Sequence, residues 1–213
     1  MTRLRILLNR GDKDTVSFFV YGLARIVLTT PLRLLYGCEV RGAENLPRQG
    51  PAIIASSHSS NLDPCIVGIS YPGVIRWMAK AELWRVPGLG WLVEKLGAFE
   101  VERGAADREA IRRARELLKQ GWVVGMFPEG TRQRQGRLGE FLPGVGMLAC
   151  GSEVPVIPLR IRGNEKIIRG FRLLRPKVVI SVGEPVDLDL ADMSRGRAFK
   201  EATSRIREAV DAL

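Results

Sequence analysis

The chain has 213 residues, 46% hydrophobic and 26% charged, which is ordinary for a single globular domain with a sizeable core. Its net charge of +10 is not ordinary, and arginine supplies most of the 33 basic residues. Because the arginine fork suits bidentate phosphate contacts, this charge favours a phosphate-bearing partner: an anionic membrane, a phosphorylated substrate or a nucleic acid. A single histidine and three widely spaced cysteines argue against a zinc site and a disulfide framework, so we expect no metal and a reducing compartment.

Residues 15–36 are mostly apolar but carry one narrow polar stripe. The stripe consists of residues that recur every four positions: Ser17, Tyr21, Arg25, Thr29 and Arg33. Arg25 in mid-segment would cost about 2.5–3.5 kcal/mol inside a bilayer, so we do not expect a membrane span. Pro31 predicts a break and a second short helix that ends at Gly37. We interpret residues 1–37 as an amphipathic, membrane-associating helical element; packing of both helices on the domain's own core is the alternative.

From residue 38 onward, short apolar runs alternate with helical patterns. Seven runs predict strands: 38–42, 51–56, 74–79, 98–103, 122–127, 154–159 and 177–182. Helices are predicted after Pro64, within 80–96, over 107–120 and over 195–213. The alternation indicates one α/β domain, residues 38–213, with a mixed, mostly parallel central sheet flanked by helices. Ligands of such sheets bind at the strand ends.

His58, the single histidine, lies between the predicted strand 51–56 and a predicted helix start. In that helix start we expect Asp63 at the N-cap and Pro64 at the first helical position. Histidine is the residue type best suited to take and return a proton near neutral pH. Across such a loop a carboxylate can hold one imidazole nitrogen and leave the other free. A structural histidine beside an ordinary Asp-Pro cap explains the same residues. We interpret Cys65 as a packed thiol rather than a nucleophile.

Two further segments carry polar chemistry. After the predicted strand 122–127, Glu129-Gly130-Thr131-Arg132 offers backbone N–H groups, a hydroxyl and an arginine, which suit an oxyanion or a phosphate. By itself this segment is equally a surface turn. The run from Arg160 to Lys177 interleaves basic and apolar residues, which suits an anionic lipid surface or the solvated face of an ordinary hairpin. No helix-turn-helix, zinc-finger or RRM signature occurs, so we do not expect nucleic acid as a partner.

Together these pieces resemble the 1-acylglycerol-3-phosphate (lysophosphatidic acid) acyltransferase family, the glycerolipid acyltransferases with an HX4D motif. Four segments resemble its four motifs in order: 58–63, 97–103, 127–132 and 154–158. The resemblance covers about residues 38–185. Two departures stand out: Ser57 replaces the asparagine that usually precedes the motif histidine, and Phe141-Leu142-Pro143-Gly144 lacks the lysine of the family's Phe-Lys-x-Gly.

The resemblance implies an enzyme that transfers a fatty acyl group from acyl-CoA or acyl carrier protein to lysophosphatidic acid, forming phosphatidic acid without a cofactor. His58 would be the general base and Asp63 the orienting carboxylate. The acceptor's phosphate would be bound by the remaining motif residues: Lys80, Arg103, Glu129, Gly130, Thr131 and Arg132. Backbone N–H groups near Gly130 are our candidates for holding the oxyanion.

We expect the protein to work on an anionic membrane surface at the cytoplasmic face of the cell membrane, as a peripheral or monotopic protein. Glycerol-3-phosphate or another lysophospholipid is the alternative acceptor. A non-catalytic basic module that binds membrane surfaces is the alternative function. The absence of a GxSxG elbow argues against a lipid hydrolase.

Overall fold

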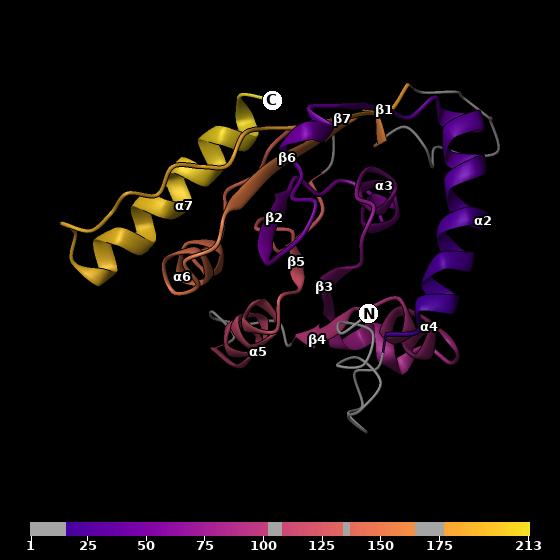
Figure 1. The fold of residues 1–213 in the computed structure, drawn as a ribbon, viewed down its shortest axis with the longest axis horizontal. Coiled ribbons are helices and arrows are strands. Elements are labelled where there is room, and N and C mark those ends of the chain that lie inside the picture. The colour runs from indigo at the N-terminus through magenta and orange to yellow at the C-terminus, as the bar shows by residue number, and fades with distance from the viewer. Residues whose placement is uncertain (1–15, 102–107, 134–136, 165–176) are drawn as a thin grey trace.

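The computed structural model describes residues 16–101, 108–133, 137–164 and 177–213, in which strands and helices alternate (Figure 1). The strands are β1 (Glu39–Arg41), β2 (Ala52–Ser56), β3 (Ile75–Lys80), β4 (Phe99–Val101), β5 (Val123–Met126), β6 (Val156–Arg162) and β7 (Val179–Val182). The α-helices are α2 (Phe18–Tyr36), α3 (Asp63–Ser70), α4 (Leu89–Lys95), α5 (Arg108–Lys119), α6 (Gly144–Cys150) and α7 (Arg195–Asp211). Two short 3-10 helices complete the set, η1 (Ala43–Asn45) and η2 (Ala81–Arg85).

The described strands form one seven-stranded sheet in the order β1-β7-β6-β2-β5-β3-β4. All neighbouring pairs are parallel except β6 and β7, which are antiparallel. The predicted mixed, mostly parallel sheet is therefore confirmed. Because β2, β3, β5 and β6 run in the same direction, the segments that follow them gather at one edge of the sheet, the edge where ligands bind in open α/β sheets.

Helices cover both faces of the sheet. Helices α5, α6 and α7 lie on one face, and α3 and α4, with α2 outside α3, lie on the other (Figure 1). Strand β2 is buried along its whole length: Ile53 and Ala55 join the apolar cluster beneath α5–α7, and Ile54 joins the opposite cluster. A strand that is covered on both faces has a continuous run of apolar residues, and this run is why the sequence predicted a buried strand at β2.

Helix α5 confirms the clearest of the helix predictions, and α6 was not predicted. The α5 residues expected to face the core, Ile111, Ala114, Leu117 and Leu118, are buried. Helix α6 buries Val145, Gly146, Leu148 and Ala149 between α5 and α7. A helix of seven residues that is apolar nearly all round has no polar face, so its sequence shows no helical period.

The predicted break at Pro31 is wrong, because α2 is one continuous helix. Its N-terminus is capped by Ser17, whose Oγ accepts a hydrogen bond from Val20 N (3.3 Å), and Gly37 ends it in the left-handed conformation. A proline inside a helix removes one backbone hydrogen bond. Two separate helices would leave additional helix ends, each with four unsatisfied backbone groups. The continuous helix therefore loses fewer hydrogen bonds than a broken one.

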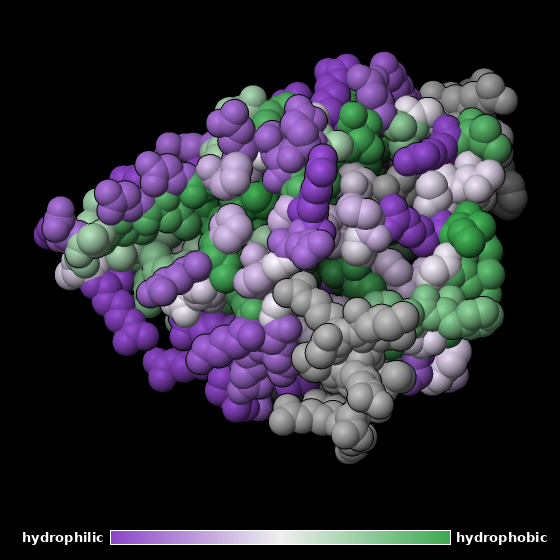
Figure 2. All heavy atoms as spheres, viewed as in Figure 1, coloured by the Kyte–Doolittle hydropathy of each residue, from purple (hydrophilic) through white to green (hydrophobic). Residues whose placement is uncertain are grey.

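The polar stripe of α2 faces the protein from Ser17 to Thr29, whereas its last member, Arg33, is exposed, and most of the apolar arc faces outward. Tyr21 Oη donates to Gly73 O (3.0 Å), and Arg25 lines a cavity against α3. On the opposite side Phe19 is 79% and Ile26 69% exposed. Four further apolar side chains of α2 are well exposed: Phe18, Leu23, Val27 and Leu34. Figure 2 shows hydrophobic residues along this side of the molecule. An ordinary surface helix has the opposite orientation.

The run from Arg160 to Lys177 was interpreted as a surface, and Arg160 does not fit that interpretation. It is buried, and its Nη1 donates to Asp211 Oδ1 (2.7 Å) and to Val210 O (3.4 Å), which ties β6 to α7. Arg162, two positions on, is exposed as expected. Residues 165–176, which hold most of the run, lie outside the described residues.

We expect Asp211→Asn to remove an acid-sensitive part of the stability. The hydrogen bond from Arg160 lowers the pKa of Asp211. A carboxyl whose pKa is lower in the folded than in the unfolded state stabilises the fold above its unfolded pKa, and this contribution is lost as the pH falls through the folded pKa. Urea unfolding at about pH 7 and about pH 3 should therefore show a smaller acid-induced loss for the variant than for the wild type. The exposed-site control Asp192→Asn should behave as the wild type, and an unchanged loss in Asp211→Asn would contradict this account.

Candidate active site

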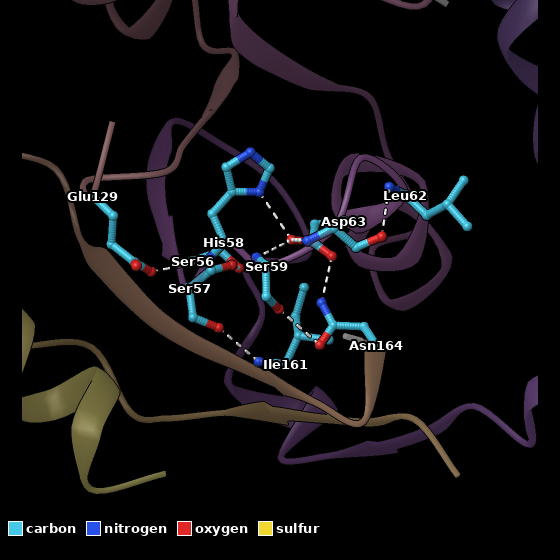
Figure 3. Close-up of polar contacts among 10 residues, drawn as sticks. Ser56, Ser57, His58, Ser59, Leu62, Asp63, Glu129, Ile161 and Asn164 are labelled. Atoms are coloured by element: carbon cyan, nitrogen blue, oxygen red, sulfur yellow. Dashed lines mark hydrogen bonds and ion pairs between the residues drawn. The ribbon is translucent and has the colours of Figure 1, made fainter. Parts of the chain in front are cut away.

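His58 lies in the loop between β2 and α3, and its Nδ1 is 2.9 Å from Asp63 Oδ2 (Figure 3). Asp63 is completely buried, whereas the His58 side chain keeps 18% of its surface exposed. An ionised carboxylate can only accept hydrogen bonds, so Nδ1 carries the proton and Nε2 keeps a free lone pair. Nε2 points away from the other labelled residues (Figure 3). The pair is therefore arranged to accept a proton from a bound hydroxyl.

Asp63 does not cap α3, so its predicted N-cap role is wrong. The N-cap position belongs to Leu62, with proline in the first turn. The Asp63 carboxylate turns back into the preceding loop, where Oδ2 accepts hydrogen bonds from the N–H groups of Ser59 (2.7 Å) and Ser60 (2.8 Å). The loop supplies three donors to this buried anion when the imidazole is included, and a buried charge requires such partners.

A fourth donor is Asn164, which follows β6 and is 1% exposed. Its Nδ2 donates to Asp63 Oδ1 (2.5 Å), and its Oδ1 accepts from Ser59 Oγ (3.0 Å). The sequence prediction missed Asn164, which stands 101 positions after Asp63. One signal pointed to it: a polar residue directly after a predicted strand lies at the sheet edge where His58 was expected.

Ser57, which departs from the family's motif, has a structural partner. Its buried Oγ accepts a hydrogen bond from Ile161 N (3.0 Å), and its own N–H donates to Leu159 O (3.1 Å). The start of the His58 loop is therefore bonded to β6 through both its main chain and its side chain.

An aromatic stack holds the face of the imidazole. The His58 ring lies on Phe127 with 4.1 Å between centroids and 18° between planes, and Phe127 lies on Trp77 at 4.7 Å and 10°. Such pairs contribute about 0.5–1.5 kcal/mol beyond their buried area. The sequence prediction did not include this stack. With one face on Phe127 and Nδ1 on Asp63, the ring has a single favoured orientation.

Glu129 contacts the main chain on both sides of the site. Its Oε1 accepts from His58 N (2.9 Å) and its Oε2 from Gly139 N (3.2 Å). Burial raises the pKa of Glu129, and the two N–H groups partly offset that rise. These contacts fit a residue that holds two loops together. Its predicted contact with phosphate stays a prediction, and repulsion between two anions argues against it.

The other predicted phosphate ligands lie at the same sheet edge. Lys80 ends β3 and is partly buried, and Thr131 and Arg132 follow β5 and are exposed. Strands β3 and β5 are neighbours, so the end of β3 and the segment after β5 lie at the same edge of the sheet. Arg103 lies outside the described residues.

Gly130 has a conformational role. It adopts a φ of +65°, and a Cβ at this position would lie 2.6 Å from Leu142 Cδ1, so the turn requires glycine. Its N–H donates to Phe127 O (3.0 Å), which gives this amide an acceptor within the turn. The oxyanion role therefore stays a prediction for the neighbouring amides. Within the described ranges, no group of three or more His, Cys, Asp or Glu side chains is placed to hold a metal ion.

Fold and site together define an α/β protein with a carboxylate-oriented histidine, the arrangement of a general base, at the carboxyl edge of its sheet. Residues 37–162 match the model of the family described as Acyltransferase. The chain belongs to this family, and the resemblance inferred from the motifs is confirmed.

Individual relatives agree with the family match. The chloroplastic 1-acyl-sn-glycerol-3-phosphate acyltransferase LPAT1 of Arabidopsis thaliana is 30% identical over 200 residues, which are 91% of this chain and 54% of that protein. The 1-acyl-sn-glycerol-3-phosphate acyltransferase of Bacillus subtilis is 29% identical over 199 residues, 91% of this chain and 96% of that protein. The chain thus spans about half the length of the plant relative and nearly all of the bacterial one.

A solved structure is similar over almost the whole chain. The crystal structure of the 1-acyl-sn-glycerophosphate (LPA) acyltransferase PlsC from Thermotoga maritima superposes with a TM-score of 0.71 at 26% identity. The match covers 98% of this chain and 86% of the PlsC chain. The fold is therefore shared with an acyltransferase.

We expect Glu129→Gln to lower the free energy of unfolding by about 1–3 kcal/mol, because an amide offers one acceptor oxygen to two partly buried N–H donors. Urea unfolding at neutral pH measures this change. Glu184→Gln changes an exposed carboxylate in the same way and should stay within about 0.5 kcal/mol of the wild type. Equal stability of the two variants would show that Glu129 does not hold the loops.

Proposed function

We propose that this chain transfers a fatty acyl group from an acyl thioester to the free hydroxyl of lysophosphatidic acid, forming phosphatidic acid. The observation that carries the proposal is the 2.9 Å contact between His58 Nδ1 and a buried carboxylate, with Nε2 left free at the ligand-binding edge. The relatives' names, 1-acyl-sn-glycerol-3-phosphate acyltransferases, support this choice of reaction and acceptor. A non-catalytic membrane module would leave this buried pair without a role.

In the proposed reaction, His58 Nε2 takes the proton of the acceptor hydroxyl while the hydroxyl oxygen attacks the thioester carbonyl carbon. Asp63, bonded to Nδ1, stabilises the imidazolium that forms. When the tetrahedral intermediate collapses, the C–S bond breaks and the imidazolium returns the proton to the leaving thiolate. The products are an ester and a free thiol, so the cycle needs neither a cofactor nor an acylated enzyme.

For the acceptor's phosphate we propose Lys80, Thr131 and Arg132. Neither Lys80 nor Arg132 forms an ion pair in the part of the chain that the structure describes. Lys80 ends β3, and Arg132 follows β5, which lies between β3 and β2. Arg103 is assigned to the same group by the family resemblance alone. The donor, acyl-CoA or acyl carrier protein, carries phosphate or acidic groups that suit the net charge of +10.

An apolar cavity beside the site suits a short part of the acyl chain. It measures about 80 Å³ and lies between α2, α3 and β3. Two of its lining residues adjoin the catalytic pair: Pro64 follows Asp63, and Trp77 belongs to the stack under His58. Cys65 also lines it, and burial raises the pKa of this thiol, which argues for packing rather than nucleophilic attack.

We propose that α2 lies in the membrane interface with its apolar arc among the lipid chains. This arc would otherwise expose Phe19 and Ile26 to water. Trp91 of α4 is 60% exposed, and α4 adjoins the start of α2 through a hydrogen bond from Ser17 N to Lys95 O (3.3 Å). The positive charge favours anionic headgroups, and we place this surface at the cytoplasmic face of the cell membrane. In the described part of the chain, no helix combines the length and hydropathy needed to cross a bilayer.

Palmitoyl-CoA and lysophosphatidic acid in mixed micelles should release free thiol with the wild type, and His58→Ala should lower kcat by at least about 10²–10⁴-fold. Circular dichroism confirms that the variant is folded. Thiol release without acceptor would indicate a thioesterase, and an active His58→Ala would refute the general base. A parallel reaction with glycerol-3-phosphate tests the alternative acceptor, and one with acyl carrier protein tests the alternative donor.

Ile26→Glu should weaken binding to vesicles that contain phosphatidylglycerol by at least roughly tenfold, because burial of an isoleucine is worth about 1.5–3 kcal/mol. Vesicle co-sedimentation measures the change. Met193→Glu places the same charge on an exposed apolar residue outside α2 and should bind as the wild type, apart from a small charge effect. Equal binding of all three proteins would exclude α2 from the membrane contact.

A further inference from the structure

The Asp63 carboxylate is held from two separate parts of the chain. Oδ2 accepts three hydrogen bonds from its own loop, from the ring of His58 and from the N–H groups of Ser59 and Ser60. Oδ1 accepts one from Asn164, beyond the end of β6. Asn164 therefore contacts the oxygen that the imidazole does not use.

We propose that Asn164 is a positioning residue: it fixes the rotation of the Asp63 carboxylate and thereby keeps the proton of neutral His58 on Nδ1. The effect of Asn164 on turnover rests on the proposed function, whereas its effect on the tautomer of the His58 ring does not.

The rotation of a carboxylate about its last bond is soft and has a broad minimum. Without Asn164, Oδ1 would be a completely buried acceptor with no partner, at a cost that a rotation toward the loop amides would relieve. Such a rotation would move Oδ2 away from His58 Nδ1. A donor on Oδ1 removes this competition, so the imidazole keeps its acceptor.

Asn164 is itself fixed in orientation and place. Ser59 Oγ donates to its Oδ1 (3.0 Å), which leaves Nδ2 facing Asp63 (Figure 3). Just upstream, Ile161 N donates to Ser57 Oγ (3.0 Å). The end of β6 is thus bonded to the start of the His58 loop, and Asn164 follows this anchored end by two positions.

The residue type also fits this role. A neutral amide donates to Asp63 without changing the charge of the pair. A lysine would neutralise the carboxylate that must stabilise the imidazolium, and an ionised aspartate would repel it. The asparagine amide donates a hydrogen bond to Asp63 Oδ1 and, being neutral, leaves the negative charge of the carboxylate to stabilise protonated His58.

Histidine NMR tests the positioning directly, because the chain has one histidine and its ¹⁵N ring signals are unambiguous. At about pH 8.5, where an imidazole is neutral, the wild type should show the Nδ1–H tautomer alone. Asn164→Ala should show a mixture of both tautomers. Asn45→Ala, which removes a different cross-element bond, from Nδ2 to Val182 O (3.1 Å), should keep the wild-type tautomer.

Kinetics give a second readout. Asn164→Ala should lower kcat by roughly 10–100-fold with KM for both substrates within about twofold, as expected when only the transition state is affected. Asn45→Ala should keep the wild-type kcat even if it lowers the melting temperature.

If Asn164→Ala fails to fold, the nearly isosteric Asn164→Asp replaces it. When protonated, the new carboxyl can donate to Asp63 Oδ1 as the amide does. Its kcat relative to the wild type should therefore rise as the pH falls from about 8 to about 6, whereas a merely structural residue gives a constant ratio.

The outcomes separate this inference from the proposed function. If the wild type transfers no acyl group but the tautomer of His58 depends on Asn164, the proposed function fails and the positioning role stands. A pure Nδ1–H tautomer in Asn164→Ala overturns the positioning role whatever the activity. If Asn164→Ala does not fold, a constant kcat ratio for Asn164→Asp overturns it.

Discussion

The buried carboxylate of Asp63 is the constraint on which the rest of the site depends. In the described chain its one ion-pair partner is His58, so its remaining capacity must be met by neutral donors. These donors come from the tip of the β2–α3 loop and from the end of β6. The hydrogen bonds that stabilise the buried carboxylate are therefore the same bonds that orient the imidazole. The loop cannot change its conformation without removing hydrogen-bond donors from this anion.

The parallel sheet explains why so few residues suffice to build this site. Strands β2, β5 and β6 are neighbours in the sheet, with β2 in the middle. His58 follows the central strand, and its neighbours supply Phe127 and Glu129 on one side and Asn164 on the other. Each of these residues stands within a few positions of the end of a buried strand, where backbone geometry is well determined. The site is thus supported by the rigid core.

Helix α2 is oriented differently from the other amphipathic helices. In the core helices the apolar residues face the sheet, whereas in α2 the polar stripe faces inward and the apolar arc outward. Tyr21 and Arg25 are consequently kept among protein atoms, beside a cavity that adjoins the catalytic loop. The apolar cavity lies on the inner side of α2, and the exposed apolar arc lies on its outer side.

The amino-acid sequence by itself determined the seven strands, the core face of α5 and the place of His58 at a strand end, because each depends on a local period or on the chemistry of one residue type. It also suggested that Asp63 is the partner of His58, since the two are five positions apart across a loop. Only the tertiary structure decided that the Asp63 side chain turns away from its helix, that Asn164 donates a hydrogen bond to the Asp63 carboxylate and that Arg160 is buried. It also decided which side α2 turns outward, because a helical stripe specifies two faces but not which of them meets the protein. The contacts of Asn164 with Asp63, of Arg160 with Asp211 and of Tyr21 with Gly73 join residues far apart in the chain, which no local sequence pattern reports.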